Sequence, residues 1–139
     1  MSYPYVQIVG SSGGTISPGD GFQLVIPAGM FSSNARIVIE APSAPGSSPP
    51  NRETAGNAYH VTQTSGPAPS SSYRFTVKVP FFSRFEQYRN QLNVHHNVDS
   101  EDPNGWMPAP NRVDDGTPGI MGGRFAGNKL LGYHCVFKG

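Results

Sequence analysis

The sequence predicts an all-β fold: an antiparallel β-sandwich of two sheets with about nine to eleven strands, long Pro/Ser/Gly-rich loops and at most one short helix. Short runs of β-branched and aromatic residues recur along the chain, and turn residues separate them roughly every 8–12 positions. The 17 glycines and 14 prolines lie between these apolar runs, so they indicate turns rather than disorder. Only one segment has the apolar spacing of a helix.

A first group of strands is expected before residue 80. Phe22, Leu24 and Ile26 alternate and therefore share one face of a strand. Pro27 ends this strand because proline has no N–H to give to a β-ladder. The strands of this group are expected at residues 5–9, 13–16, 22–26, 36–40, 59–64 and 73–79.

Two of these strands differ in how they are expected to be covered. Residues 37–39 are apolar in succession, which indicates a strand covered on both faces. The segment 73–79 instead has the clearest half-buried pattern, because its apolar side chains alternate with polar ones. The apolar set is Tyr73, Phe75, Val77 and Val79.

The rest of the chain is expected to hold one helical turn and a second group of strands. Residues 83–91 have helical spacing, with Ser83 as the N-cap and Glu86 three positions further on. The later strands are expected at residues 92–98, from 106 onward, at 120–125 and at 130–137. The proline-rich segment 41–56 has few apolar side chains and is expected to be an exposed excursion.

Size and composition predict a single domain spanning residues 1–139 and exclude several classes of partner. The net charge is +1 without a basic patch, so nucleic acid is not expected as a partner. No apolar stretch approaches the ~18 residues of a membrane span, so no membrane insertion is expected. The chain shows no secretory signal, which predicts cytoplasmic synthesis and is compatible with assembly into a virion or an extracellular structure.

Several motifs occur in a set order through most of the chain. They are Gly13-Gly14-Thr15-Ile16, Ile26-Pro27-Ala28-Gly29-Met30, Ala35-Arg36-Ile37-Val38-Ile39, Tyr73-Arg74-Phe75, Val79-Pro80-Phe81 and Gly105-Trp106-Met107-Pro108. In this order they resemble the ZU5-type β-sandwich module, which is found in ankyrins, netrin receptors and bacterial surface proteins. The resemblance implies a single ZU5-like sandwich over the whole chain.

In several members of that family, the last strand carries a His-Phe-Ser-x-Phe motif at which the chain cleaves itself. Aligned on Phe137, Cys135 falls at the nucleophile position and Tyr133 replaces the assisting histidine. The neighbouring His134 faces the other side of the strand, so it is poorly placed to act as a base. We therefore expect no self-cleavage and a buried, inert thiol at Cys135.

The densest polar cluster is the segment from His95 to Asp102. Imidazole and carboxylate groups together are typical ligands of divalent metals, but no His-x-His or His-x₃-His spacing occurs here. The acidic residues also lack the glycine and the distal glutamate of an EF-hand loop. No nucleophile elbow or phosphate-binding loop is found elsewhere, so we expect no catalytic residues, no metal and no cofactor.

Two functions are compatible with this pattern. The first is a non-catalytic structural or protein-interaction module that belongs to a larger assembly or self-assembles, with another protein or another copy of the chain as partner. The alternative is a lectin-like module that binds a glycan through Trp106, Asn104, Asp102 and His96. The interaction module is the leading prediction because the low charge, the proline-rich loops and the lack of a polar pocket signature fit surface exposure in an assembly. The position of Trp106 in the ZU5-like pattern suggests a core residue, and we expect no enzymatic activity.

Overall fold

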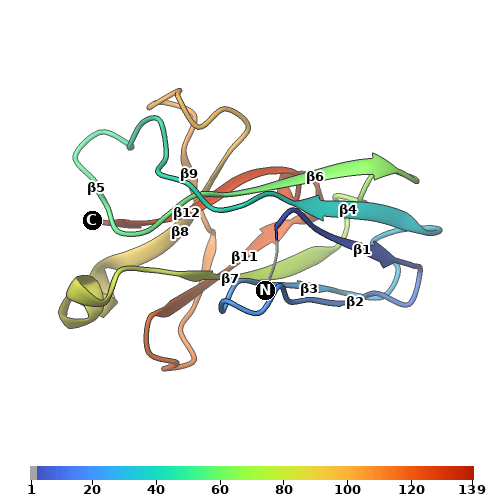
Figure 1. Cartoon of the computed structure of the whole chain (residues 1–139), viewed down its shortest axis with the longest axis horizontal. Helices are drawn as coiled ribbons and strands as arrows, with labels where there is room; N and C mark the ends of the chain where they lie inside the picture. Colours follow the sequence, from blue (N-terminus) through green and yellow to red (C-terminus); the bar gives the residue numbers. More distant parts are fainter. Residues whose placement is uncertain (1–2) are drawn as a thin grey trace.

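Two antiparallel β-sheets face each other in the computed structural model, which describes residues 3–139 (Figure 1). The predicted all-β, two-sheet sandwich is therefore confirmed. The structure describes twelve strands, one more than the upper end of the expected range. The additional strands are very short ones that form by pairing with longer neighbours.

The larger sheet has seven strands in the order β1-β4-β6-β12-β8-β9, with β5 pairing to β12 off this path. Its two ends are therefore β1 and β9. The strands are β1 (Tyr5–Val9), β4 (Ala35–Ile39), β5 (Glu53–Thr54), β6 (Tyr59–Ser65), β8 (Leu92–Asn97), β9 (Met107–Pro108) and β12 (Gly132–Lys138).

The smaller sheet has five strands in the order β10-β11-β7-β3-β2, so β10 and β2 are its ends. Its central strand β7 pairs along its full length with β11 and over three residues with β3. The strands are β2 (Gly14–Ile16), β3 (Gln23–Ile26), β7 (Arg74–Pro80), β10 (Asn111–Val113) and β11 (Ile120–Ala126).

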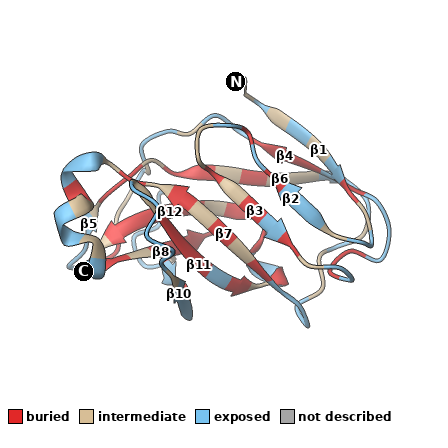
Figure 2. Cartoon of the chain, turned by 90° about the horizontal axis from the view of Figure 1, so that it is seen from below, coloured by how far each residue is buried: buried red, intermediate tan, exposed pale blue. Residues whose placement is uncertain are grey.

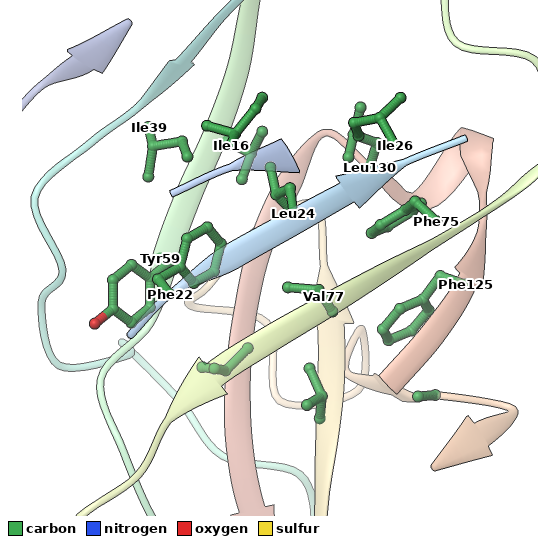
Figure 3. Packing of buried hydrophobic residues seen from close by; sticks show 14 of the residues in the cluster. Ile16, Phe22, Leu24, Ile26, Ile39, Tyr59, Phe75, Val77, Phe125 and Leu130 are labelled. Carbon is green, nitrogen blue, oxygen red and sulfur yellow. The ribbon is translucent and has the colours of Figure 1, made fainter. Parts of the chain in front are cut away.

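The core lies between the two sheets, and two-residue alternation explains which side chains enter it (Figures 2 and 3). Phe22, Leu24 and Ile26 are buried as expected, and β3 ends at Ile26, immediately before Pro27. The prediction for β7 is correct for its phenylalanine and valines and wrong for Tyr73. Tyr73 is 42% exposed, because the strand begins one residue later.

The expected helical turn is present as the 3₁₀-helix η1 (Ser83–Gln91), but the predicted cap is wrong. Phe82 occupies the N-cap position and no side chain caps the helix. Glu86 uses its carboxylate elsewhere, accepting hydrogen bonds from Arg89 and from the backbone N–H of Gly119. It therefore ties the helix to the loop before β11. A second 3₁₀ turn, η2 (Gly127–Lys129), connects β11 to β12.

The expectation of an exposed excursion at residues 41–56 is wrong for part of the segment. Ser43 pairs with Ala58, and the two residues of β5 pair with β12. Pro49 and Ala55 are buried. Ala55 packs in the main core, whereas the part of the segment around Ser47 lies over the outer face of the larger sheet beside Trp106.

Asp20 joins three parts of the chain at one end of the sandwich. Its Oδ2 accepts hydrogen bonds from the hydroxyls of Tyr3 at 2.6 Å and Tyr59 at 2.9 Å, and its Oδ1 accepts the N–H of Phe22 at 3.1 Å. Burial, assisted by the bonds to Asp20, raises the pKa of both tyrosines, so both remain donors at neutral pH. The carboxylate thus links β6, the turn before β3 and the residues preceding β1.

Replacing Asp20 with alanine is expected to lower the free energy of unfolding by about 2–3 kcal/mol, because three donors lose their acceptor. Asp20→Asn keeps an acceptor for the amide of Phe22, so a smaller loss of about 1 kcal/mol is expected. Urea unfolding followed by the fluorescence of the single tryptophan measures both values. An Asp20→Ala loss below about 0.5 kcal/mol, the size of an ordinary surface substitution, would contradict this role.

Candidate interaction surface

The four residues predicted to bind a glycan do not share one surface. Trp106 and His96 are buried, at 4% and 2% exposure, on opposite faces of the larger sheet. His96 packs in the core beside Phe125, whereas Trp106 packs on the outer face. Asp102 and Asn104 are exposed in the turn before Trp106. An indole this buried has no free face on which a sugar ring could stack.

Trp106 instead anchors the two loops that cover one half of the outer face. Its ring packs edge-on against Phe137 of β12, with 4.9 Å between centroids. Its Nε1–H donates to Ser47 Oγ at 3.0 Å, and that hydroxyl donates to the carbonyl of Ser100 at 2.8 Å. The segment 41–56 and the turn 98–105 are thereby held together over β8 and β12.

His95 and His96 face opposite sides of β8, as strand alternation predicts. The ring of His95 meets Phe137 on the outer face, whereas that of His96 lies 5.1 Å from the ring of His134 in the core. Over residues 3–139 the structure brings no three His, Cys, Asp or Glu side chains close enough to hold a metal ion.

Cys135 is fully buried on the outer face of β12, and its thiol lies 3.4 Å from the carbonyl oxygen of Gly56. Burial raises the pKa of this thiol to about 12. His134 faces the core, but the residue directly opposite Cys135 on β8 is His95. Inspection of the last strand alone missed this histidine, because only the register of β8 against β12 places it there. Burial lowers the pKa of His95 to about 4, so a neutral thiol faces a neutral imidazole at pH 7.

Three surface depressions of the sandwich are lined by other residues than these. One, of about 320 Å³, lies at the end of β6 and is lined by Gln63, Ser65 and Leu131 among others. Two smaller ones lie beside η1 and between the turn before β3 and the loop before β11, and neither is lined by Cys135, Trp106 or a histidine.

Among residues 3–139, no loop covers the other half of the outer face of the larger sheet, over β1, β4 and β6 (Figure 1). In Figure 1 the two loops rise over the opposite end of this sheet, on the side of β8, β9 and β12. The uncovered half exposes Val6 at 41% and Ile8 at 54%, both on β1. Val6 lies beside Val38 and Ile8 beside Arg36 on β4, so the exposed strip is bordered on β4 by one apolar and one charged side chain. Figure 2 shows β1 at the margin of the molecule, with exposed positions along it.

β1 also differs from the three other strands at sheet ends. β9 has two residues, one of them Pro108, and β10 has three residues that include Arg112. β2 has three residues. Short length, proline and charge are the usual means by which proteins prevent a sheet edge from pairing with another chain. β1 has five residues, Tyr-Val-Gln-Ile-Val, without charge, proline or glycine.

Hydrogen bonding within the sheet determines which backbone groups of β1 remain free. The N–H of Glu40 donates to the carbonyl of His60 at 2.9 Å, which makes these opposite residues a hydrogen-bonded pair. Because such pairs alternate with non-bonded ones, Val38 also directs its N–H and C=O toward β6. Ile37 and Ile39 therefore direct theirs toward β1.

The residues of β1 opposite these isoleucines are Gln7 and Tyr5, so their backbone groups bond to β4. Val6 and Ile8 consequently direct their N–H and C=O groups away from the sheet. Within residues 3–139, no strand, loop backbone or side chain bonds to these groups. The edge of β1 thus combines two exposed apolar side chains with four free backbone hydrogen-bonding groups.

The comparisons with known proteins give no identification. No protein-family model matches the chain, and no curated protein matches it. Within the described residues, no helix is long and apolar enough to cross a membrane.

Proposed function

We propose that this protein is a non-catalytic structural or protein-interaction module, a unit of a larger or self-assembling structure, that makes contact through the edge of β1. The observation that carries this proposal is the uncharged edge strand with its free backbone groups. An extended strand from another chain would add to this edge by β-augmentation. The motif order that resembles ZU5-type modules supports the same kind of role.

The energetics of such a contact suit assembly. Burial of Val6 and Ile8 would contribute about 1–2 kcal/mol per side chain, and each backbone hydrogen bond about 1 kcal/mol. Association itself costs about 4–15 kcal/mol in lost translational and rotational freedom. A single contact at β1 is therefore expected to be weak, and repeated contacts in an assembly would raise the overall avidity.

Sedimentation velocity over a range from micromolar to millimolar protein tests the proposal. Wild-type protein is expected to self-associate, and Val6→Lys is expected to abolish this association because a charge on an edge strand blocks strand pairing. Val98→Lys is the matched control, because Val98 is 79% exposed in a turn far from β1 in the sheet and undergoes the same chemical change. It should associate as the wild type does.

If Val6→Lys and Val98→Lys associate equally, the edge of β1 is not the contact surface and the proposal is contradicted. A wild-type chain that stays strictly monomeric at every concentration would exclude self-assembly, and a failure to bind an extended peptide of another protein as well would contradict the proposal.

A further inference from the structure

We infer that the partner at this edge is a second copy of the same chain, whose β1 pairs antiparallel with the first around a two-fold axis at Gln7. This inference rests on the proposed function and specifies the occupant and the register of the contact.

The free backbone groups select the register. With Gln7 opposite Gln7 of the second copy, Val6 lies opposite Ile8 in both directions. Since Val6 and Ile8 carry the free N–H and C=O groups, all of these groups find partners and four hydrogen bonds form. Every donor and acceptor at the free edge of the strand is then satisfied.

The neighbouring registers satisfy fewer groups. An axis at Val6 places Ile8 opposite Pro4, which has no N–H to donate. An axis at Ile8 places Val6 opposite Gly10, whose carbonyl already accepts the N–H of Gly13 at 3.1 Å. Pro4 and Gly10 therefore bound the usable edge, and its centre is Gln7.

The side chains are compatible with the same pairing. On the outer face, Val6 of each copy meets Ile8 of the other, which joins the two exposed apolar strips into one. On the inner face, the two Gln7 side chains meet as a non-hydrogen-bonded pair, for which Cα atoms lie about 4.5 Å apart. Because β1 carries no charge, the pairing brings no like charges together. A strand that pairs with its own copy in this way forms a self-complementary two-fold contact.

The test uses the short distance between the two Gln7 positions. Cα atoms about 4.5 Å apart are within the range of a disulfide, so Gln7→Cys chains are expected to form a covalent dimer through residue 7 under mild oxidation. The native Cys135 is buried and does not compete. Val25→Cys is the control, since Val25 is 37% exposed on β3 in the other sheet. We expect Gln7→Cys to cross-link roughly tenfold or more faster than Val25→Cys, because pairing raises the effective concentration of the thiols.

A second pair of variants keeps the test valid if Gln7→Cys misfolds. That variant loses the hydrogen bond from the Gln7 side-chain amide to the carbonyl of Thr15. A mixture of Val6→Cys and Ile8→Cys chains, both altered at exposed positions, is expected to give the mixed 6–8 dimer in preference to the 6–6 and 8–8 dimers. Mass spectrometry of the digested products identifies each linkage.

The outcomes separate this inference from the proposed function. Preferential 7–7 and 6–8 linkages support it. A wild-type chain that self-associates, with variants that cross-link no faster than Val25→Cys, overturns the two-fold register and leaves an interaction module with another geometry. A protein that stays monomeric but binds an extended peptide of another protein at β1 also overturns the second copy as occupant. A wild-type chain that neither self-associates nor binds such a peptide overturns the proposed function as well.

Discussion

Trp106→Ala is expected to lower the free energy of unfolding by about 3–5 kcal/mol, the range for removing a large buried aromatic side chain. The indole packs against Phe137 and is 4% exposed. Its hydrogen bond to Ser47 also holds the segment 41–56 to the turn 98–105. The substitution therefore removes both a packing contact and the joint between the two covering loops. Chemical denaturation followed by circular dichroism measures the loss, because the fluorescence probe is absent in this variant.

Trp106→Phe separates the two contributions. Phenylalanine keeps an aromatic contact with Phe137 but has no N–H for Ser47, so a smaller loss is expected, of which about 1 kcal/mol comes from the hydrogen bond.

The alanine variant should also increase the reactivity of Cys135 toward thiol reagents in the folded protein, since Trp106 and Cys135 belong to the same outer cluster. A nearly unchanged stability of Trp106→Ala would show that the loops do not depend on the indole.

Acid is expected to destabilise the protein through His134. Its Nε2 lies 2.9 Å from the carbonyl oxygen of Leu130 and so carries the proton, while Nδ1 is buried and has no hydrogen-bond partner among residues 3–139. Burial, with a contribution from the neighbouring His96, lowers the pKa of His134 to about 3. In the unfolded chain the same imidazole has a pKa near 6.5.

The direction of the effect follows from these two pKa values. Between pH 6.5 and about 3 the unfolded state binds a proton that the folded state does not, so stability falls as the pH falls. One such histidine costs about 1.4 kcal/mol for each pH unit below 6.5, or about 2 kcal/mol between pH 7 and pH 5. His95 and His96 also have lowered pKa values, chiefly because they are buried, and add to the same trend.

His134→Leu tests this account, because leucine fills the core position without a titrating group. The difference in unfolding free energy between pH 7 and pH 5 is expected to shrink by about 2 kcal/mol in this variant. His60→Gln is the control. His60 lies half-buried on the outer face against Tyr133, and its pKa is lowered by burial and partly restored by Glu40. An unchanged pH dependence of the unfolding free energy in His134→Leu would mean that groups other than His134 cause the acid destabilisation.

Local side-chain patterns predict the central strands well. The alternation in β3 and β7 identifies their buried faces, because each of these strands lies on a core that only one face can enter. Pro27 marks the end of β3 because its missing N–H acts locally. The apolar succession at residues 37–39 matches the burial of all three side chains, although Val38, on the outer face, is 7% exposed because β1 and β6 flank it and not because a loop covers it.

Features that depend on long-range pairing could not be predicted from these patterns. β5 and β10 consist of two and three mostly polar residues, and they become strands only because β12 and β11 lie beside them. Ser83 has the sequence of an N-cap, but the chain enters η1 with Phe82 at that position. The segment 41–56 resembles an exposed loop because the apolar surface that it covers belongs to β12.

The candidate surface was missed for the same physical reason. Residues 5–9 were expected to form a strand, but nothing local indicates that this strand lies at the end of a sheet. The order of the strands makes β1 an edge, and the hydrogen-bond pairing of β4 with β6 determines which of its groups are free. The uncharged Tyr-Val-Gln-Ile-Val run is the one signal in the sequence that could have drawn attention to it.

Amide hydrogen exchange at Val6 and Ile8, followed as a function of protein concentration, tests the role of the β1 edge most directly. These amides have no partner within the described chain, whereas the amide of Gln7 bonds to β4 and serves as an internal reference. The account predicts fast exchange at Val6 and Ile8 in dilute protein and marked protection at concentrations where the chain associates, with little change at Gln7. Fast exchange at Val6 and Ile8 in the associated protein would contradict it.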